Sequence, residues 1–436
     1  MICKLLDSVT DFKEFLSVDE LNKEITSMVD SNNIINLGKS ENGNSIISVK
    51  IGKGKENALI FGFPHPNEPV GSLTCIELVK ILLNNEKLRN RYTWYIIPCV
   101  DPDGAKLNEG WFKGKFTIKK YAYNFFRPPG KYQIDWSFPV KYKDYEFLNP
   151  TKETKILIKL INKIKPSLIY PLHNAGFGGA YFYINRKMPT NYYDKIIDLC
   201  KKLSIHIDYG ESEAVFMKEL KKPFYLSPSF EEMYDYFEKS GINPKEMFEN
   251  GTNSIDYAKK LNQNVFGMIG EIPYIYDPKI SNKKKTSIPR RIIFQEKYKE
   301  RIEVIEFIRK NMNNKFINKK SIFFHQFENV MEQKKATILL QEMLSKKEYD
   351  KLATVSEKFG SLVISRFFML LLLGQFRRLL LDSNRNNQTK QIVKKIEKKI
   401  DNILTYVEKE SNYKTLPIKK LVQLQLGLLL ISLEYL

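Results

Sequence analysis

A histidine and a carboxylate lie three residues apart directly after an apolar run, and this spacing constrains the chain more than any other feature. Residues 58–60 have the composition of a buried strand, and the turn after them contains His65 and Glu68. Two side chains at positions i and i+3 on a rigid strand end can bind one zinc ion. The same residues also fit a polar turn that caps a helix predicted at 69–83.

Two further polar residues follow apolar runs in the same way. His173 comes after residues 167–172 and precedes a glycine-rich stretch, and the carboxyl end of a strand is where α/β proteins place ligands and catalytic groups. Glu271 ends the apolar run 267–270 and is followed by a proline after one residue. A histidine satisfied within a loop and a surface glutamate are the alternative interpretations of these two residues.

Taken together, the four residues have the order and separations of a zinc hydrolase with three protein ligands and an open fourth position. Two histidines and one carboxylate leave room for a water molecule, whose pKa falls to about 7 on zinc. A nearby carboxylate can then act as the general base for that water. Glu271 is the natural candidate for this base.

The chain resembles the zinc carboxypeptidases of the carboxypeptidase A type. The separation between Glu68 and His173 is 173 − 68 = 105 residues, close to the spacing between the second and third ligands of that family. Residues 98–104 are similar to the family's Asn-Pro-Asp-Gly turn, and residues 37–46 are like the Gly-x-Ser-x-x-Gly strand pair of its bacterial members. The resemblance covers about residues 30–280.

The resemblance implies a role for each matching residue. It implies that one zinc ion is bound by His65, Glu68 and His173, and that Glu271 is the general base and proton shuttle. Arg127 is the candidate for the arginine that polarises the scissile carbonyl, a task that suits an always-charged guanidinium. Asp135 looks like the carboxylate that accepts the second imidazole proton of the first histidine ligand, although an exposed carboxylate is an equal alternative.

One feature of the family is missing. The family has an Asn-Arg pair that clamps the terminal carboxylate of the substrate, whereas residues 136–139 here read Trp-Ser-Phe-Pro. Carboxylate recognition must therefore use Arg127 or Arg186, or the enzyme does not require a free C-terminus. The family's catalytic tyrosine has no clear match, and Tyr257 is one possibility among 24 tyrosines.

Strand and helix patterns alternate over the first part of the chain, which predicts a layered α/β domain with helices on both faces of a sheet. The resemblance implies that the central sheet is mixed. Strands are predicted at 45–51, 57–63 and 92–99, and helices at 18–30, 69–84, 151–164 and 190–203. Residues 277–291 combine prolines with a lysine run and are the predicted linker that ends a catalytic domain of residues 1–290.

Residues 295–436 show almost purely helical patterns and predict an all-α C-terminal domain of open role: a lid, a dimer surface or a substrate-docking module. Its most apolar piece, 362–374, is shorter than the roughly 18 residues of a membrane span and contains Arg366. We therefore expect a buried bundle helix and no membrane span. Residues 421–436 should pack against this helix.

The net charge of +20 suggests nucleic acid as a partner, but the distribution of the charge argues against it. The lysines are spread along the chain without the interleaved aromatic residues that stack on bases, so no nucleic-acid partner is expected. A positive surface could still steer anionic substrates. The four scattered cysteines and the absence of a signal-peptide pattern predict a reduced, cytoplasmic protein.

Three functions follow from these observations. The first is a zinc metallocarboxypeptidase that releases C-terminal residues from a peptide substrate. The second is a zinc-dependent amidohydrolase or deacylase of the same clan, which acts on small N-acyl amino acids or tailored peptides. The third is a non-catalytic binding module, and the complete set of ligands and base argues against it.

Overall fold

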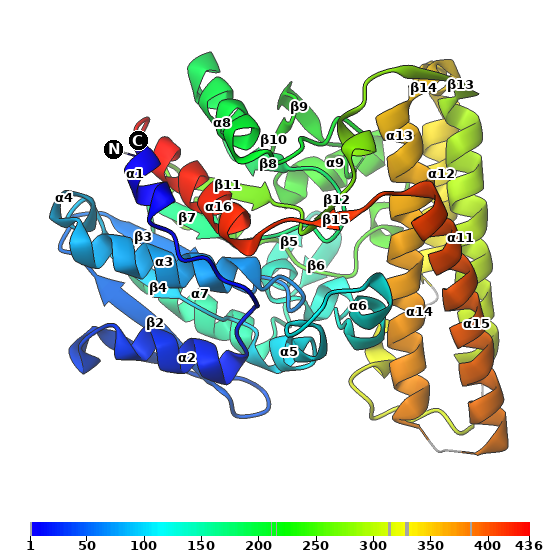
Figure 1. Cartoon of the computed structure of the whole chain (residues 1–436), viewed down its shortest axis with the longest axis horizontal. Coiled ribbons are helices and arrows are strands. Elements are labelled where there is room, and N and C mark those ends of the chain that lie inside the picture. The colour runs from blue at the N-terminus through cyan, green and yellow to red at the C-terminus, as the bar shows by residue number, and fades with distance from the viewer. Residues whose placement is uncertain (1, 211, 215, 313–314, 328–330, 384–385) are drawn as a thin grey trace.

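A mixed sheet forms the centre of the protein. The computed structural model describes every residue except 1, 211, 215, 313–314, 328–330 and 384–385. Within this described part, the main sheet has nine strands in the order β1-β2-β4-β3-β7-β11-β8-β10-β9 (Figure 1). These strands are β1 (Ile34–Lys39), β2 (Ser45–Ile51), β3 (Asn57–Phe61), β4 (Thr93–Ile97), β7 (Leu168–Pro171), β8 (Tyr181–Ile184), β9 (Lys218–Lys221), β10 (Phe224–Leu226) and β11 (Phe266–Glu271).

The middle of the sheet, β4-β3-β7-β11, is parallel, and an antiparallel pair borders it on each side; beyond that, β8 and β10 pair in parallel. Strand β3 pairs in parallel with both β4 and β7, and β7 pairs in parallel with β11. On the flanks, β1 runs antiparallel to β2, and β8 antiparallel to β11. The residues of β7 are buried throughout, as expected for a strand that is covered on both faces. The expected mixed sheet is thereby confirmed.

Helices cover both faces of this sheet. The helices are α1 (Ile2–Asp7), α2 (Val18–Ser27), α3 (Val70–Asn84), α4 (Glu86–Arg89), α5 (Pro102–Lys106), α6 (Ile118–Asn124), α7 (Lys152–Ile164), α8 (Thr190–Leu203), α9 (Phe230–Lys239), α10 (Ser254–Leu261), α11 (Arg290–Met312), α12 (Met331–Ser345), α13 (Val355–Phe359), α14 (Ser365–Leu381), α15 (Asn387–Glu410) and α16 (Ile418–Ser432). Helices α3, α8 and α16 contribute to one hydrophobic core, and α7 and α10 to a second one. The predicted α/β class with a helical C-terminal region is confirmed.

The predicted linker segment contains regular structure. Lys285–Pro289 forms strand β13, which pairs with β14 (Leu352–Thr354). Strand β12 (Ile275–Tyr276) pairs with β15 (Lys414–Thr415), far along the chain. Pro278 and Lys279 lie in a short 3-10 helix, and Lys285 and Pro289 lie in β13. The β12-β15 pair brings together the points where the chain enters and leaves the helical region.

The last helix does not pack where the sequence suggests. Residues 421–436 were expected against the apolar run 362–374, but α16 packs against α3, α8 and α1 (Figure 1). This position explains why α16 is apolar on nearly all sides, because other helices and the sheet surround it. The division of the chain near residues 290–295 stays a prediction. Helix α16 follows this division in sequence but packs against helices of the part that contains the sheet.

The apolar run belongs to a longer helix than the sequence pattern suggested. Val355–Leu381 is helical throughout and includes a π-helical turn at Gly360–Ile364. By length and composition it is the one stretch among the described residues that could cross a membrane, but 83% of its most apolar window is buried inside the protein. Its neighbours are α6, α11 and α15, so the expectation of a buried bundle helix is confirmed.

The contact between α14 and α6 depends on a glycine. A Cβ atom added at Gly374 would lie 1.9 Å from the backbone oxygen of Ala122 in α6. Gly360, in the same helical stretch, has nothing within 4 Å of the corresponding position. Gly374 is therefore required for the close approach of α14 to α6, and Gly360 is not, so the two glycines can be compared directly.

We predict that Gly374→Ala lowers the free energy of unfolding by about 1–3 kcal/mol, because the methyl group forces the two helices apart. Gly360→Ala should be neutral or stabilising by up to about 1 kcal/mol, since alanine has the higher helix propensity. Urea denaturation of both variants measures the difference. Equal stability of the two variants would contradict the packing described here.

Candidate metal centre

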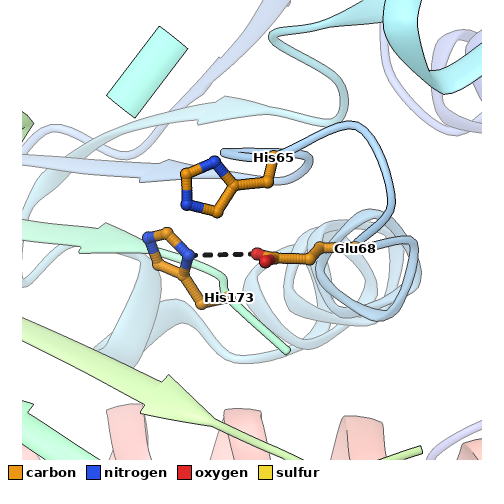
Figure 2. Close-up of side chains that lie close together, drawn as sticks. All are labelled: His65, Glu68 and His173. Atoms are coloured by element: carbon orange, nitrogen blue, oxygen red, sulfur yellow. Dashed lines mark hydrogen bonds and ion pairs between the residues drawn. The ribbon is translucent and has the colours of Figure 1, made fainter. Parts of the chain in front are cut away.

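Three predicted ligands converge at one edge of the sheet. His65 and Glu68 lie in the turn between β3 and α3, and His173 follows β7, the parallel neighbour of β3. One ligand atom from each of the three residues lies within 4.8 Å of the others, and the two imidazole rings have centroids 4.8 Å apart (Figure 2). All three side chains are buried. The carboxyl ends of two parallel strands thus bring together residues 105 positions apart in the chain.

The close approach of α3 to β7 requires a residue without a side chain. A Cβ atom at Gly71, in the first turn of α3, would lie 2.5 Å from both the Cβ and the carbonyl oxygen of Leu172. Asn174 also connects the two sides of this contact. Its side-chain Oδ1 accepts from the backbone amide of Val70 at 3.2 Å, and its backbone N–H donates to Glu68 Oε2 at 3.4 Å. The turn that carries Glu68 is therefore held directly against the strand that ends in His173.

The donor set fits a zinc ion. His173 Nδ1 lies 3.0 Å from Glu68 Oε2, the contact dashed in Figure 2. His65 Nδ1 is buried and has no hydrogen-bond partner among the described residues. A buried nitrogen without a partner costs free energy unless another group satisfies it. Two imidazoles and one carboxylate around a common point are the ligand types that zinc prefers.

Asp135 bonds to a different histidine from the one predicted. The expected partner was His65, but Asp135 Oδ2 lies 3.1 Å from His173 Nε2. The alternative of an exposed carboxylate is also wrong, because Asp135 is 1% exposed. Its Oδ1 accepts from the Ser254 amide at 2.9 Å, which leaves Oδ2 facing His173. When Nε2 donates to Asp135, the lone pair of Nδ1 is free to face Glu68 and the common point.

The two histidines respond to their surroundings in opposite ways. Burial lowers the pKa of His65 well below its usual value, and the charges of Arg127 and His173 act in the same direction. Burial would also lower the pKa of His173, but Glu68 and Asp135 outweigh it and raise the pKa to about 10. In the absence of a metal, His65 is therefore neutral, and His173 carries a proton that partly balances the buried carboxylates.

Glu271 lies at the same edge of the sheet. It ends β11, which is the other neighbour of β7, and its Oε1 lies 3.9 Å from His173 Nδ1. Burial, followed by the charge of Glu68, raises the pKa of the Glu271 carboxyl to about 8. A carboxylate with a pKa near neutrality can both accept and return a proton. The structure thus places the predicted base beside the predicted ligands.

Arg127 is also brought to this cluster. Its Nη1 lies 3.2 Å from Glu68 Oε1, and its Nε and Nη2 donate to Gln133 Oε1 at 3.3 and 3.2 Å. The backbone amide of Arg127 donates to Gln375 Oε1 of α14 at 2.9 Å. Sequence reasoning missed both glutamines. No spacing signal points to Gln375, because 248 residues separate it from the arginine it holds.

Two other predicted residues lie elsewhere. The guanidinium of Arg186 lies 5.1 Å from the ring centroid of Phe266, the first residue of β11, whereas Glu271 is the last residue of that strand. The hydroxyl of Tyr257 donates to Asn162 Oδ1 on α7 at 3.0 Å, away from the ligand cluster. Both suggestions for the site are therefore wrong. Tyr121, which the sequence did not single out, is buried near Glu68 and Arg127, and its burial raises its pKa.

The contact of Asp135 with His173 predicts the effect of a conservative change. In an Asp135→Asn variant the Ser254 amide still needs an acceptor, so the side-chain NH₂ turns toward His173 Nε2. This group can only donate, which forces the imidazole proton onto the metal-facing Nδ1. We expect zinc affinity to fall by about 10–100-fold, as for other partners of metal ligands. Competition with a chelator measures this affinity.

A matched control is Asp256→Asn. Asp256 is a buried carboxylate whose Oδ2 accepts from the Thr252 hydroxyl and the Phe230 amide, and neither partner belongs to the ligand cluster. This variant should keep the zinc affinity of the unmodified protein. Unchanged affinity in a folded Asp135→Asn variant would show that the Asp135 contact does not orient a ligand.

Comparisons with known proteins address the family of the chain. Among solved structures, a metallo-carboxypeptidase from Burkholderia cenocepacia is 14% identical, with a TM-score of 0.37 over 59% of this chain and 60% of that one. Carboxypeptidase A from Helicoverpa armigera is 14% identical, with a TM-score of 0.37 over 63% and 70%. A murein-tripeptide amidase from Escherichia coli O157 is 15% identical, with a TM-score of 0.30 over 60% and 89%.

The family itself is shown by a match of sequence. No curated protein matches the chain significantly. The family model described as zinc carboxypeptidase matches residues 18–262, which is more than half of the chain and includes His65, Glu68 and His173. The chain therefore belongs to the zinc carboxypeptidase family.

Proposed function

We propose that this protein is a zinc-dependent metallocarboxypeptidase that hydrolyses the C-terminal amide bond of a peptide. Family membership already makes it a hydrolase of the metallopeptidase class. The observation that carries the finer proposal is the placement of three kinds of group at one sheet edge. The first is the ligand cluster of His65, Glu68 and His173. The second is the carboxyl group of Glu271, whose pKa is raised, and the third is the guanidinium of Arg127, which contacts Glu68 and Gln133.

A zinc ion held by the three ligands would supply a Lewis acid and lower the pKa of a bound water to about 7. Glu271 lies where it can take a proton from the attacking water and later deliver it to the leaving amine. Its raised pKa suits this double task, because the carboxyl group must hold the proton between the two steps. Asp135 keeps His173 in one orientation throughout.

The contacts of Arg127 support its proposed role, which is to stabilise the negative charge that develops on the carbonyl oxygen of the substrate. Its two bonds to Gln133 fix the plane of the guanidinium, and the backbone bond to Gln375 fixes its starting point. A donor that is already in place costs no reorganisation when charge builds up on the carbonyl oxygen of the substrate. The guanidinium is also charged at any pH at which the enzyme works.

A second function is supported by what the site lacks. The Asn-Arg clamp is absent from residues 136–139, and Arg186 lies at the far end of β11. Of the basic residues considered for the substrate carboxylate, Arg127 alone reaches the cluster. An amidohydrolase or deacylase of the same clan, acting on N-acyl amino acids or tailored peptides, is the alternative, and it does not need the clamp where its substrate lacks a free α-carboxylate.

We further propose a cytoplasmic location. None of the four cysteines forms a disulfide, and Cys75, Cys99 and Cys200 are buried as thiols. Unpaired buried thiols are typical of proteins that work in a reducing compartment. Fractionation of the source cells with an antibody to the protein tests this proposal.

Replacing the proposed base tests the chemistry. Glu271→Gln should bind zinc as before but lose about 10²–10⁴-fold in turnover, because the amide cannot take up the proton. Glu213→Gln is the matched control, since Glu213 is a nearby carboxylate that accepts from the Tyr183 hydroxyl. Metal analysis and steady-state kinetics on both variants provide the readouts. Near-normal turnover by zinc-loaded Glu271→Gln would remove Glu271 from the mechanism.

The choice between the two functions requires a substrate comparison. Zinc-loaded protein is incubated with a peptide library carrying free or amidated C-termini, and with a set of N-acyl amino acids, and the products are identified by mass spectrometry. Loss of cleavage upon amidation supports the carboxypeptidase. Cleavage that ignores amidation, or that is confined to the acyl amino acids, supports the alternative. No hydrolysis of any of these compounds would contradict both functions.

A further inference from the structure

Helix α16 lies beyond the residues matched by the family model, yet one of its side chains contacts the main chain of a predicted ligand. Gln425 is fully buried, and its Nε2 donates to the carbonyl oxygen of His173 at 2.7 Å. Its Oε1 accepts from the hydroxyl of Thr74 on α3 at 2.5 Å. The single side chain therefore bridges the helix that follows Glu68 and the strand end that carries His173.

The orientation of the Gln425 amide follows from its two partners. A backbone carbonyl can only accept a hydrogen bond, so the NH₂ group must face His173. The amide oxygen must then face Thr74, whose hydroxyl donates to it. The reverse orientation would place two oxygens against each other at His173. The bridge thus has one arrangement, which suits a fixed support.

The residues around the Gln425 side chain are buried, so water does not readily replace its hydrogen bonds. Thr74 and Tyr170 are buried, and the Tyr170 hydroxyl donates to the backbone oxygen of Gln425 at 3.4 Å. Loss of the amide would leave the His173 carbonyl and the Thr74 hydroxyl without these partners in the protein interior, where such groups are costly. Asp135 thus contacts the ring of His173, and Gln425 contacts its main chain.

We propose that Gln425 is a positioning residue of the metal centre, which sets the main chain of His173 relative to α3 and hence relative to Glu68. This inference rests on the proposed function, because it takes His173 as a zinc ligand. It assigns the last helix of the chain a part in the metal site, although that helix follows the helical region in sequence.

The test compares two glutamines of the same helix. Gln423 is also buried, and its Nε2 donates to a backbone carbonyl, that of Leu6, at 2.9 Å. Leucine at either position keeps the approximate volume and removes the donor. We expect Gln425→Leu to weaken zinc binding by about 10-fold, at the lower end of the effects of residues that support metal ligands. Gln423→Leu should lose stability without a change in zinc affinity.

Three measurements separate positioning from general stability. Chelator competition gives the zinc affinity of the full-length variants, and the visible spectrum of the Co²⁺-loaded proteins reports the geometry of the ligands. Urea denaturation of the metal-free forms gives their stability. A changed spectrum in Gln425→Leu alone supports the inference. Equal affinity and spectrum in Gln425→Leu and the unmodified protein, or equal weakening in both leucine variants, would overturn it.

Two further results are decisive. If Gln425→Leu does not fold, Thr74→Val removes only the hydroxyl that orients the amide. Weaker zinc binding in that variant supports the inference, and unchanged binding overturns it. If the unmodified protein binds no zinc, the proposed function fails and the inference fails with it. Normal zinc binding by the unmodified protein with no effect of any variant rejects the inference alone.

Discussion

The parallel pairing of β3 with β7 is the interaction on which the rest of the site depends. It brings the carboxyl ends of two strands from distant parts of the chain to one edge of the sheet. His65 and Glu68 leave that edge from one strand and His173 from the other. Strand β11 extends the parallel group by one position and adds Glu271. The backbone hydrogen bonds of the sheet therefore set the spacing of the ligands before any side chain is considered.

The site concentrates charge in a place where charge is costly. Glu68, Asp135 and His173 are buried together, and Arg127 and Glu271 border them. Without a metal, the protonated His173 and the Arg127 guanidinium are the positive groups that balance the carboxylates. Such an arrangement seldom adds stability, because desolvation offsets the attraction between the charges. Its retention is understandable if a divalent cation completes the balance.

The helical region is tied to the site through the loop that carries Arg127. Helix α14 packs on α6, and Arg378 Nη1 donates to the carbonyl oxygens of Leu107, Asn124 and Phe125 at 2.9–3.0 Å. Gln375, one turn earlier, accepts from the Arg127 amide. Helix α14 thus contacts the main chain of the loop that carries Arg127. The region that no family resemblance covers is thus a structural part of the centre that the resemblance defines.

Some features of this protein were contained in the sequence alone. The strand at 45–51, the helix at 190–203 and the His65–Glu68 spacing could be predicted, because hydrophobic periodicity and short-range spacing are local properties. The family resemblance added His173 as the third ligand and Glu271 as the base. Other features were decided by the tertiary structure. The partner of Asp135, the displacement of Arg186 to the far end of β11 and the return of α16 to the sheet depend on packing between distant segments, which no local pattern records.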